Sequence, residues 1–296
     1  MKLAIGPLLT HHAPEALAAF YDEAATWPVD RVYLGEVVCS RRRSFRIVDW
    51  LDAAARLADA GKEVVLSAQA LMEAEADLRA LRRLVDDGRF LVEANDMGAV
   101  RLLSGKAPFV AGPHLNIASA ESLALLASLG AVRWVPPVEL SREMIAAIAA
   151  ERPAGLELEL FAYGRMPLAF SARCFTARHY DRPKDDCEFR CIDHPDGLDV
   201  RTRDGAPYLV LNGTQTQSWR TLDLGGEVAS MRGAGVDAVR LSPSIAGFGA
   251  IVSVWRDAID GAIAPDAASR ALAPLARSER CDGYWHGRPG IERIGA

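Results

Sequence analysis

Two kinds of hydrophobic pattern alternate along most of this chain. Short runs rich in β-branched and other apolar residues predict strands, at residues 2–5, 31–38, 63–67, 90–93, 109–111, 132–135, 156–162 and 236–241. Stretches in which alanine, leucine and arginine recur with helical spacing predict helices, at residues 14–25, 49–60, 73–85, 97–103, 119–129, 141–150 and finally 247–261. Every predicted helix except the last lies between two predicted strands.

Eight strands with intervening helices predict an α/β fold of the TIM-barrel type, a (βα)8 barrel in a single domain that spans residues 1–296. The strand–helix repeat averages about 25 residues, which suffices for a barrel unit. An open doubly wound sheet is the alternative. Against it, the segment GPLLTHH after the first strand is not the glycine-rich phosphate fingerprint of that fold.

The pattern breaks down between the seventh and eighth strands. Residues 164–224 form an irregular insertion that carries a charged, cysteine-bearing loop and a probable hairpin with Asp204 and Gly205 at its turn. Loops that follow the carboxyl ends of barrel strands are where barrels keep their sites. We therefore expect the functional site in this insertion.

Composition narrows the class of protein. Half of the 296 residues are hydrophobic, a quarter are charged and the net charge is −5, which argues against bulk binding of nucleic acid. We find no signal peptide and no apolar run long enough to span a bilayer. A cytoplasmic protein with reduced thiols is expected, and an odd count of five cysteines then favours metal or redox chemistry over disulfides.

Four of the cysteines are candidate metal ligands. Cys174, Cys187 and Cys191 cluster in the charged insertion, and Cys39 closes the predicted second strand, at the same rim of the barrel. Four thiolates suit either Zn²⁺ or an iron–sulfur cluster, and their wide spacing is unlike paired C-x2-C knuckles. The basic residues nearby favour thiolate over thiol. The alternative is that Cys39 is a small core residue and the other three are incidental.

Weaker candidates also follow predicted strands, and each has an ordinary structural alternative such as a solvated loop, an ion pair or a helix cap. They are His11, His12, Glu36, Glu93, Asp96, His114, Asn116, Glu139 and the run Arg41, Arg42 and Arg43. The sequence contains no H-E-x-x-H, G-x-S-x-G or P-loop motif, so hydrolase and nucleotide chemistry of those kinds lack support. The catalytic residues, if any, are not identified.

The segment ELFAYGRMPLAFSARCF, from Glu159 to Phe175, resembles the hallmark of the peptidase U32 family. The family's first cysteine in this segment is Pro167 here. That departure, together with YLGEVVCSRRR around Cys39 and DRPKDDCEFRC around Cys187 and Cys191, is similar to one branch of the family, which acts in O2-independent ubiquinone biosynthesis. The similarity extends over nearly the whole chain.

This resemblance implies a [4Fe–4S] cluster held by Cys39, Cys174, Cys187 and Cys191, with Cys281 as a non-ligand. It further implies a heterodimer with a second U32 protein, a lipid-binding accessory protein, prephenate as oxygen donor and a polyprenylated aromatic substrate for ring hydroxylation. Four thiolates saturate such a cluster, which favours electron transfer or a structural role over substrate ligation. A U32-type peptidase, an RNA-modifying U32 enzyme and a non-catalytic partner protein are the alternatives.

Overall fold

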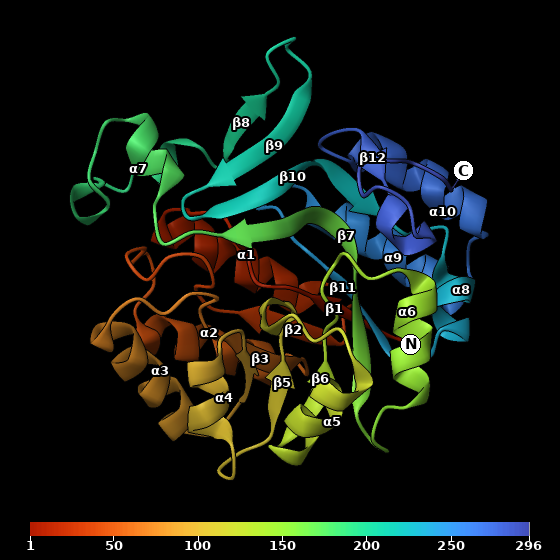
Figure 1. The fold of residues 1–296 in the computed structure, drawn as a ribbon, viewed down its shortest axis with the longest axis horizontal. Coiled ribbons are helices and arrows are strands. Elements are labelled where there is room, and N and C mark those ends of the chain that lie inside the picture. The colour runs from red at the N-terminus through yellow and green to blue at the C-terminus, as the bar shows by residue number, and fades with distance from the viewer. Residues whose placement is uncertain (296) are drawn as a thin grey trace.

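Eight parallel strands close into a barrel in the computed structural model, which describes residues 1–295 (Figure 1). The barrel strands are β1 (Lys2–Ile5), β2 (Arg31–Leu34), β3 (Glu63–Ser67), β4 (Leu91–Ala94), β5 (Phe109–Ala111), β6 (Ala131–Trp134), β7 (Glu157–Phe170) and β11 (Ala238–Leu241). Each pairs with its neighbour in chain order, and β11 pairs with both β7 and β1, which completes the circuit. The predicted TIM-barrel-like fold is confirmed, and the open sheet is excluded.

Helices cover the outside of the barrel. They are α1 (Pro14–Thr26), α2 (Ile47–Asp59), α3 (Glu75–Asp87), α4 (Met97–Leu103), α5 (Ala120–Ser128), α6 (Arg142–Ala150), α8 (Val228–Gly233) and α9 (Phe248–Asp260). Gly261 ends α9 in the left-handed conformation, as expected of a C-cap. The chain then starts another helix, α10 (Pro265–Leu272), so the expectation that the helix over 247–261 is the last one is wrong. None of the helices in residues 1–295 is both long and apolar enough to cross a membrane.

The second strand is shorter than predicted, ending at Leu34 rather than at residue 38. Gly35 has φ of +141°, and a Cβ atom there would lie 2.5 Å from the backbone oxygen of Ser67. The chain therefore turns out of the barrel at a position that only glycine tolerates. As a result Cys39 lies in the loop that follows β2, beyond the strand itself.

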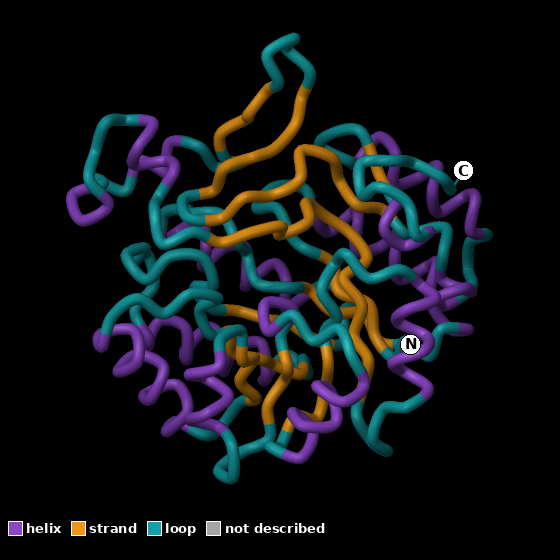
Figure 2. The backbone as a smooth tube through the Cα atoms, in the orientation of Figure 1, coloured by secondary structure: helices purple, strands orange, loops and turns teal. Residues whose placement is uncertain are grey.

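The seventh strand is longer than predicted, continuing from the barrel to Phe170. Its outer half pairs antiparallel with β10 (Gln215–Asp223), which in turn pairs with β9 (Pro207–Asn212), and β9 with β8 (Leu198–Arg201). Much of the insertion at 164–224 is therefore an antiparallel sheet and not irregular structure. Figure 2 shows this sheet standing on the barrel, with the predicted hairpin projecting from it.

The cysteine-bearing loop follows the end of β7 in the chain. It contains α7 (Phe175–His179) and two short 3-10 helices, η2 (Lys184–Asp186) and η3 (Arg190–Asp193). Further 3-10 turns are η1 (Pro113–Leu115), η4 (Ala273–Leu275) and η5 (Gly283–His286), and a short strand β12 (Arg280–Cys281) pairs with β10.

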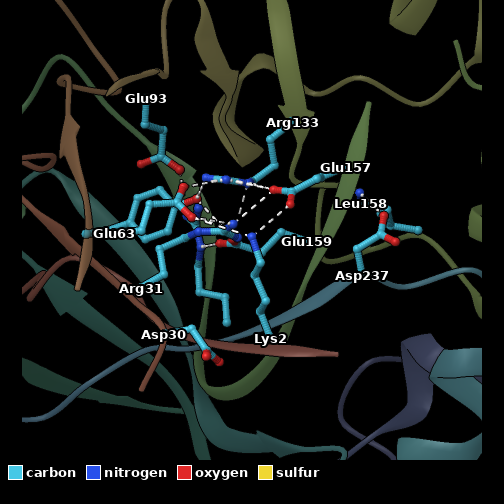
Figure 3. Close-up of polar contacts among 12 residues, drawn as sticks. Lys2, Asp30, Arg31, Glu63, Glu93, Arg133, Glu157, Leu158, Glu159 and Asp237 are labelled. Carbon is cyan, nitrogen blue, oxygen red and sulfur yellow. Dashed lines mark hydrogen bonds and ion pairs between the residues drawn. The ribbon is translucent and has the colours of Figure 1, made fainter. Parts of the chain in front are cut away.

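Charged side chains gather inside the barrel (Figure 3). A small apolar cluster on the barrel strands is separate from the main hydrophobic core and consists of Ala4, Tyr33, Val65, Val110 and Val135. Glu159 is fully buried and accepts hydrogen bonds from Arg31 at 2.6 Å and from Arg240 at 2.7 Å. Arg240 also donates to Glu93 at 2.6 Å, and its guanidinium lies 3.8 Å from the ring centroid of Tyr33. The ion pairs link strands on opposite sides of the barrel and fill its centre.

Candidate metal centre

Cys39 is held in a tight loop just beyond β2. The carboxylate of Glu36 accepts the backbone N–H groups of Val38 at 2.9 Å and of Cys39 at 3.0 Å. The carbonyl of Cys39 in turn accepts the N–H of Arg42 at 3.0 Å. This short network fixes the backbone on both sides of the thiol, which is half-buried.

Arg42 lies at the centre of the candidate site. Its side chain is buried and donates to the carbonyl of Leu9 at 2.7 Å and to Oδ1 of Asn212 at 2.6 Å. Its positive charge acts to lower the pKa of the thiols of both Cys39 and Cys191. One guanidinium therefore joins the loop after β1, the turn after β9 and two of the candidate ligands.

Cys174 caps the first turn of α7. Its Sγ accepts the N–H of Ala177 at 3.4 Å, a distance suited to sulfur. The N–H of Phe175 donates to the carbonyl of Gly213 at 2.9 Å, which holds the helix against the turn between β9 and β10. Cys174 also lies close enough to Cys191 to act electrostatically on that thiol.

Cys191, in η3, contacts a histidine from the loop after β1. Its Sγ lies 3.2 Å from Nδ1 of His11, and Nε2 of His11 lies 3.0 Å from the hydroxyl of Ser44. His11 and His12 are both only 6% exposed, so the alternative of a solvated loop pair is wrong. The insertion and the barrel rim meet at this contact.

The segment that carries Cys187 is anchored by contacts of the residues just before it. Lys184, three residues earlier, donates to the carbonyl of Ala172 at 2.9 Å and pairs with Glu73. Asp185 pairs with Arg41, two residues after Cys39. The thiol of Cys187 itself is half-buried and forms no hydrogen bond within residues 1–295.

Two of the candidate thiols, those of Cys39 and Cys191, are neutral in the metal-free protein. Burial raises the pKa of Cys39 to about 11 despite the opposing charge of Arg42, and burial also raises the pKa of Cys191. Burial, reinforced by Arg42, lowers the pKa of His11 to about 4, so its imidazole is neutral. A metal bound here would displace thiol protons, which makes its binding dependent on pH.

The donor set fits a thiolate-ligated group. All four candidate cysteines are unpaired by disulfides and half-buried, and their segments are tied together at one rim. Among residues 1–295, no three His, Cys, Asp or Glu side chains are grouped as ligands of a single ion. A [4Fe–4S] cluster is bound through four cysteine thiolates, a donor set that these four residues would supply.

Cys281 is separate from this group. It is fully buried in β12, where it pairs with β10, and burial raises the pKa of its thiol to about 12. Although the residues around it in the sequence are polar, the thiol packs in the hydrophobic core.

Most of the weaker candidates have structural roles. Asp96 caps α4 by accepting the N–H of Gly98 at 2.6 Å, and Glu93 belongs to the ion pairs inside the barrel. Glu36 shapes the Cys39 loop as described. The run of three arginines does not form one solvated face, because Arg42 is buried, Arg41 pairs with the insertion and only Arg43 is exposed.

His114, Asn116 and Glu139 line a cavity at the barrel mouth, together with Pro167 and Phe170. The ring of His114 lies edge-on to that of Phe170, with 4.7 Å between centroids. Burial lowers the pKa of His114 to about 4, so it is a neutral hydrogen-bonding group there. Sequence patterns placed these residues at the rim, but they gave no sign that Arg42 is buried or that His11 contacts Cys191.

A family model and several solved structures are similar to this chain. The model of peptidase family U32 matches residues 15–295. Among solved structures, the chain is similar to the U32 peptidase Mk0906, with 14% identity and a TM-score of 0.47 over 82% of this chain and 93% of that one. It is also similar to N-acetylneuraminate lyase from Mycoplasma synoviae, with 8% identity and a TM-score of 0.44 over 88% and 78% of the two chains. Dihydropteroate synthase from Thermus thermophilus matches with 14% identity and a TM-score of 0.41 over 86% and 93%. At these identities the reactions of those proteins carry no weight for this chain.

Proposed function

Because this chain belongs to peptidase family U32, we propose that it is the UbiV-type member of that family, the iron–sulfur subunit of an O2-independent hydroxylase of ubiquinone biosynthesis. The observation that carries the proposal is the set of four half-buried, unpaired cysteines, two of which, Cys39 and Cys191, lie near the buried Arg42. Pro167, in place of the wider family's cysteine, is consistent with a ligand recruited from the loop after β2.

In this proposal Cys39, Cys174, Cys187 and Cys191 hold a [4Fe–4S] cluster. The cluster, when bound, supplies one-electron redox chemistry. The protein's own part is to hold the four thiols, to keep water away from them and to offset their negative charge. Arg42 supplies a buried positive charge beside two of the thiols, which stabilises thiolate over thiol.

The proposed partners are those that the family resemblance implies. They are a UbiU-like U32 protein in a heterodimer, a lipid-binding accessory protein, prephenate as oxygen donor and a polyprenylated aromatic substrate. We propose that the protein works in the cytoplasm. A U32-type peptidase or an RNA-modifying U32 enzyme is the alternative, and no particular observation favours either over the main proposal.

Anaerobic purification followed by iron, sulfide and zinc assays tests the cluster. We expect a brown protein with about four iron and about four sulfide per chain and a visible absorption that bleaches on reduction. A colourless protein that holds one tightly bound zinc would contradict the proposal.

Single substitutions then test the ligand set. Cys39→Ala, Cys174→Ala, Cys187→Ala and Cys191→Ala should each lose most of the iron, whereas Cys281→Ala should keep it because that thiol lies in the core. Copurification with a co-expressed UbiU-like protein tests the heterodimer separately. A cluster that survives loss of Cys39 would show that the ligand assignment is wrong.

A further inference from the structure

A cavity distinct from the cysteine centre opens where the carboxyl ends of β7 and β11 separate. Its empty space is about 580 Å³, part of it open to solvent. The separation begins at Gly164, which has φ of +119° and where a Cβ atom would lie 2.7 Å from that of Ser242. Beyond this glycine β7 leaves the barrel to join β10, and the space between β7 and the segment after β11 is left unfilled.

Two arginines contact Asp196 at this cavity, one at its carboxylate and the other at its backbone carbonyl. Arg277 forms an ion pair with the side chain of Asp196, whereas Arg165 donates only to the backbone carbonyl of Asp196. The Nε atom of Arg165 is buried and has no hydrogen-bond partner within residues 1–295. The Asp196 side chain is 56% exposed, which weakens its neutralising effect.

The charges are therefore unbalanced in the cavity. Burial lowers the pKa of Arg277, and the nearby charge of Arg165 lowers it further. Burial likewise lowers the pKa of Arg165. Asp199 offsets part of the charge of Arg165, but Asp196 and Asp199 are both exposed, so the two partly buried guanidinium groups leave a site that gains by binding an anion.

The rest of the lining indicates an anion with an apolar body. Ser242 and Ser244 line the cavity, and their hydroxyls form no hydrogen bond within residues 1–295. Phe248, Ile251 and Leu275 form an apolar wall beside them. Ligand sites commonly combine such a wall with a small number of placed polar groups.

We propose that this cavity binds a small organic carboxylate, with its head group between Arg165 and Arg277 and a compact apolar body against Phe248 and Ile251. The proposal does not depend on the iron–sulfur cluster. The site lies one loop away from the cysteine centre, since Thr10 lines the cavity and His11 contacts Cys191.

Calorimetric titration of the purified full-length chain with phenylacetate tests the proposal, with phenylacetamide as the neutral analogue and inorganic phosphate as a second anion. We expect phenylacetate to bind in the millimolar range or tighter, and phenylacetamide to bind about tenfold more weakly or worse. Phosphate lacks an apolar body and should bind more weakly than phenylacetate.

Arg277→Gln should weaken phenylacetate binding by about tenfold or more, because it removes a charge-assisted hydrogen bond. Arg203→Gln makes the same charge change on the exposed hairpin and should leave binding unchanged. Ser244→Phe, which fills the cavity without altering its charge, should abolish binding. Melting temperatures confirm that each variant is folded.

Four results would overturn the proposal. They are no binding of phenylacetate, equal binding of the amide, tighter binding of phosphate, and a loss of affinity in Arg203→Gln as large as that in Arg277→Gln. Repeating the titration on protein stripped of metal separates this proposal from the proposed function, since binding here should survive loss of the cluster.

Discussion

Arg42 shows how one side chain can organise a site built from distant segments. Its guanidinium reaches the carbonyl of Leu9, the amide of Asn212 and the surroundings of two cysteines while remaining buried. Arginine suits this position because its planar fork donates in several fixed directions at once. Lysine carries the same charge but cannot make the same set of hydrogen bonds.

Arg42→Lys should therefore lower the free energy of unfolding of the metal-free protein by about 2 kcal/mol, because hydrogen bonds to Leu9 and Asn212 are lost while the charge is kept. Urea denaturation measures the difference. Arg43→Lys, at the exposed neighbouring position, is the matched control and should change little. Equal stability of the two variants would mean that the buried hydrogen bonds of Arg42 do not support the fold.

At the scale of elements, β7 is the strand that joins the barrel to the antiparallel sheet of β8, β9 and β10. It pairs in parallel with β11 up to Tyr163 and antiparallel with β10 from there to Phe170. Gly164 lies at the change of partner, close against Ser242. Its positive φ and the lack of room for a side chain both require glycine.

Gly164→Ala should destabilise the protein by about 3 kcal/mol or more, since the added methyl group meets both a strained φ and the Ser242 backbone. Gly61→Ala is the control, because Gly61 also has a positive φ but has nothing within 4 Å of the added atom. That variant should lose only about 1 kcal/mol. Thermal or urea unfolding compares them, and equal losses would show that close packing at Gly164 is unimportant.

Hydrophobic patterning predicts the barrel strands and the helices around them because each is a local element with one regular period. The pattern misplaces the ends of β2 and β7, since these depend on how Gly35 and Gly164 pack against Ser67 and Ser242, which are distant in sequence. It predicts the hairpin of β8 and β9 but misses how β10 joins that hairpin to β7, because β7 changes partners at Tyr163 without any break in the strand.

In the candidate site too, local features could be predicted from the sequence, whereas contacts between distant segments could not. Cys39 and the loop cysteines could be recognised from residue type and position, because thiols in a charged loop at a barrel rim are unusual. The buried position of Arg42 and the contact between His11 and Cys191 could not, because each joins segments that only the fold brings together. The sequence likewise gave no sign that Arg165 and Arg277 line one cavity, since the two residues are far apart in the chain.

The whole molecule is organised around charged groups inside the barrel. At its amino-terminal end Glu157 accepts hydrogen bonds from Arg133 at 2.7 Å and from Arg31 at 2.9 Å, and both arginines also pair with Glu63 (Figure 3). These ion pairs connect β2, β3, β6 and β7 across the barrel. Removing one partner of such a group leaves a buried charge uncompensated, which costs more than the pair contributes.

Low pH should therefore lower the free energy of unfolding, over a pH range that the pKa of Glu157 defines. Burial tends to raise the pKa of Glu157, but hydrogen bonds and charge from Arg133 and Arg31 outweigh it and lower the pKa to about 2. Because the folded-state pKa is depressed, this stabilisation is complete above the unfolded-state value, about 4.3, and is lost as the pH falls from there toward about 2.

Glu157→Gln should cost about 2 kcal/mol at pH 7, a figure reduced for the partial solvent exposure of the carboxylate, and the difference from the unsubstituted protein should shrink at pH 3. Urea unfolding at the two pH values measures this change. Glu121→Gln, on the exposed face of α5, serves as the control and should show no pH-dependent difference. A gap for Glu157→Gln that stays constant between pH 7 and pH 3 would contradict the assigned role of the ion pairs.

The closure of the barrel has a consequence for how this chain can diverge. The circuit is completed by β11 pairing with β7 at residues 159–163, upstream of the whole cysteine-bearing insertion. Insertions, deletions and ligand replacements between Phe170 and Gly213 therefore leave every pairing between barrel strands intact. Selection can thus recruit or discard cysteines in that segment while the barrel scaffold stays folded.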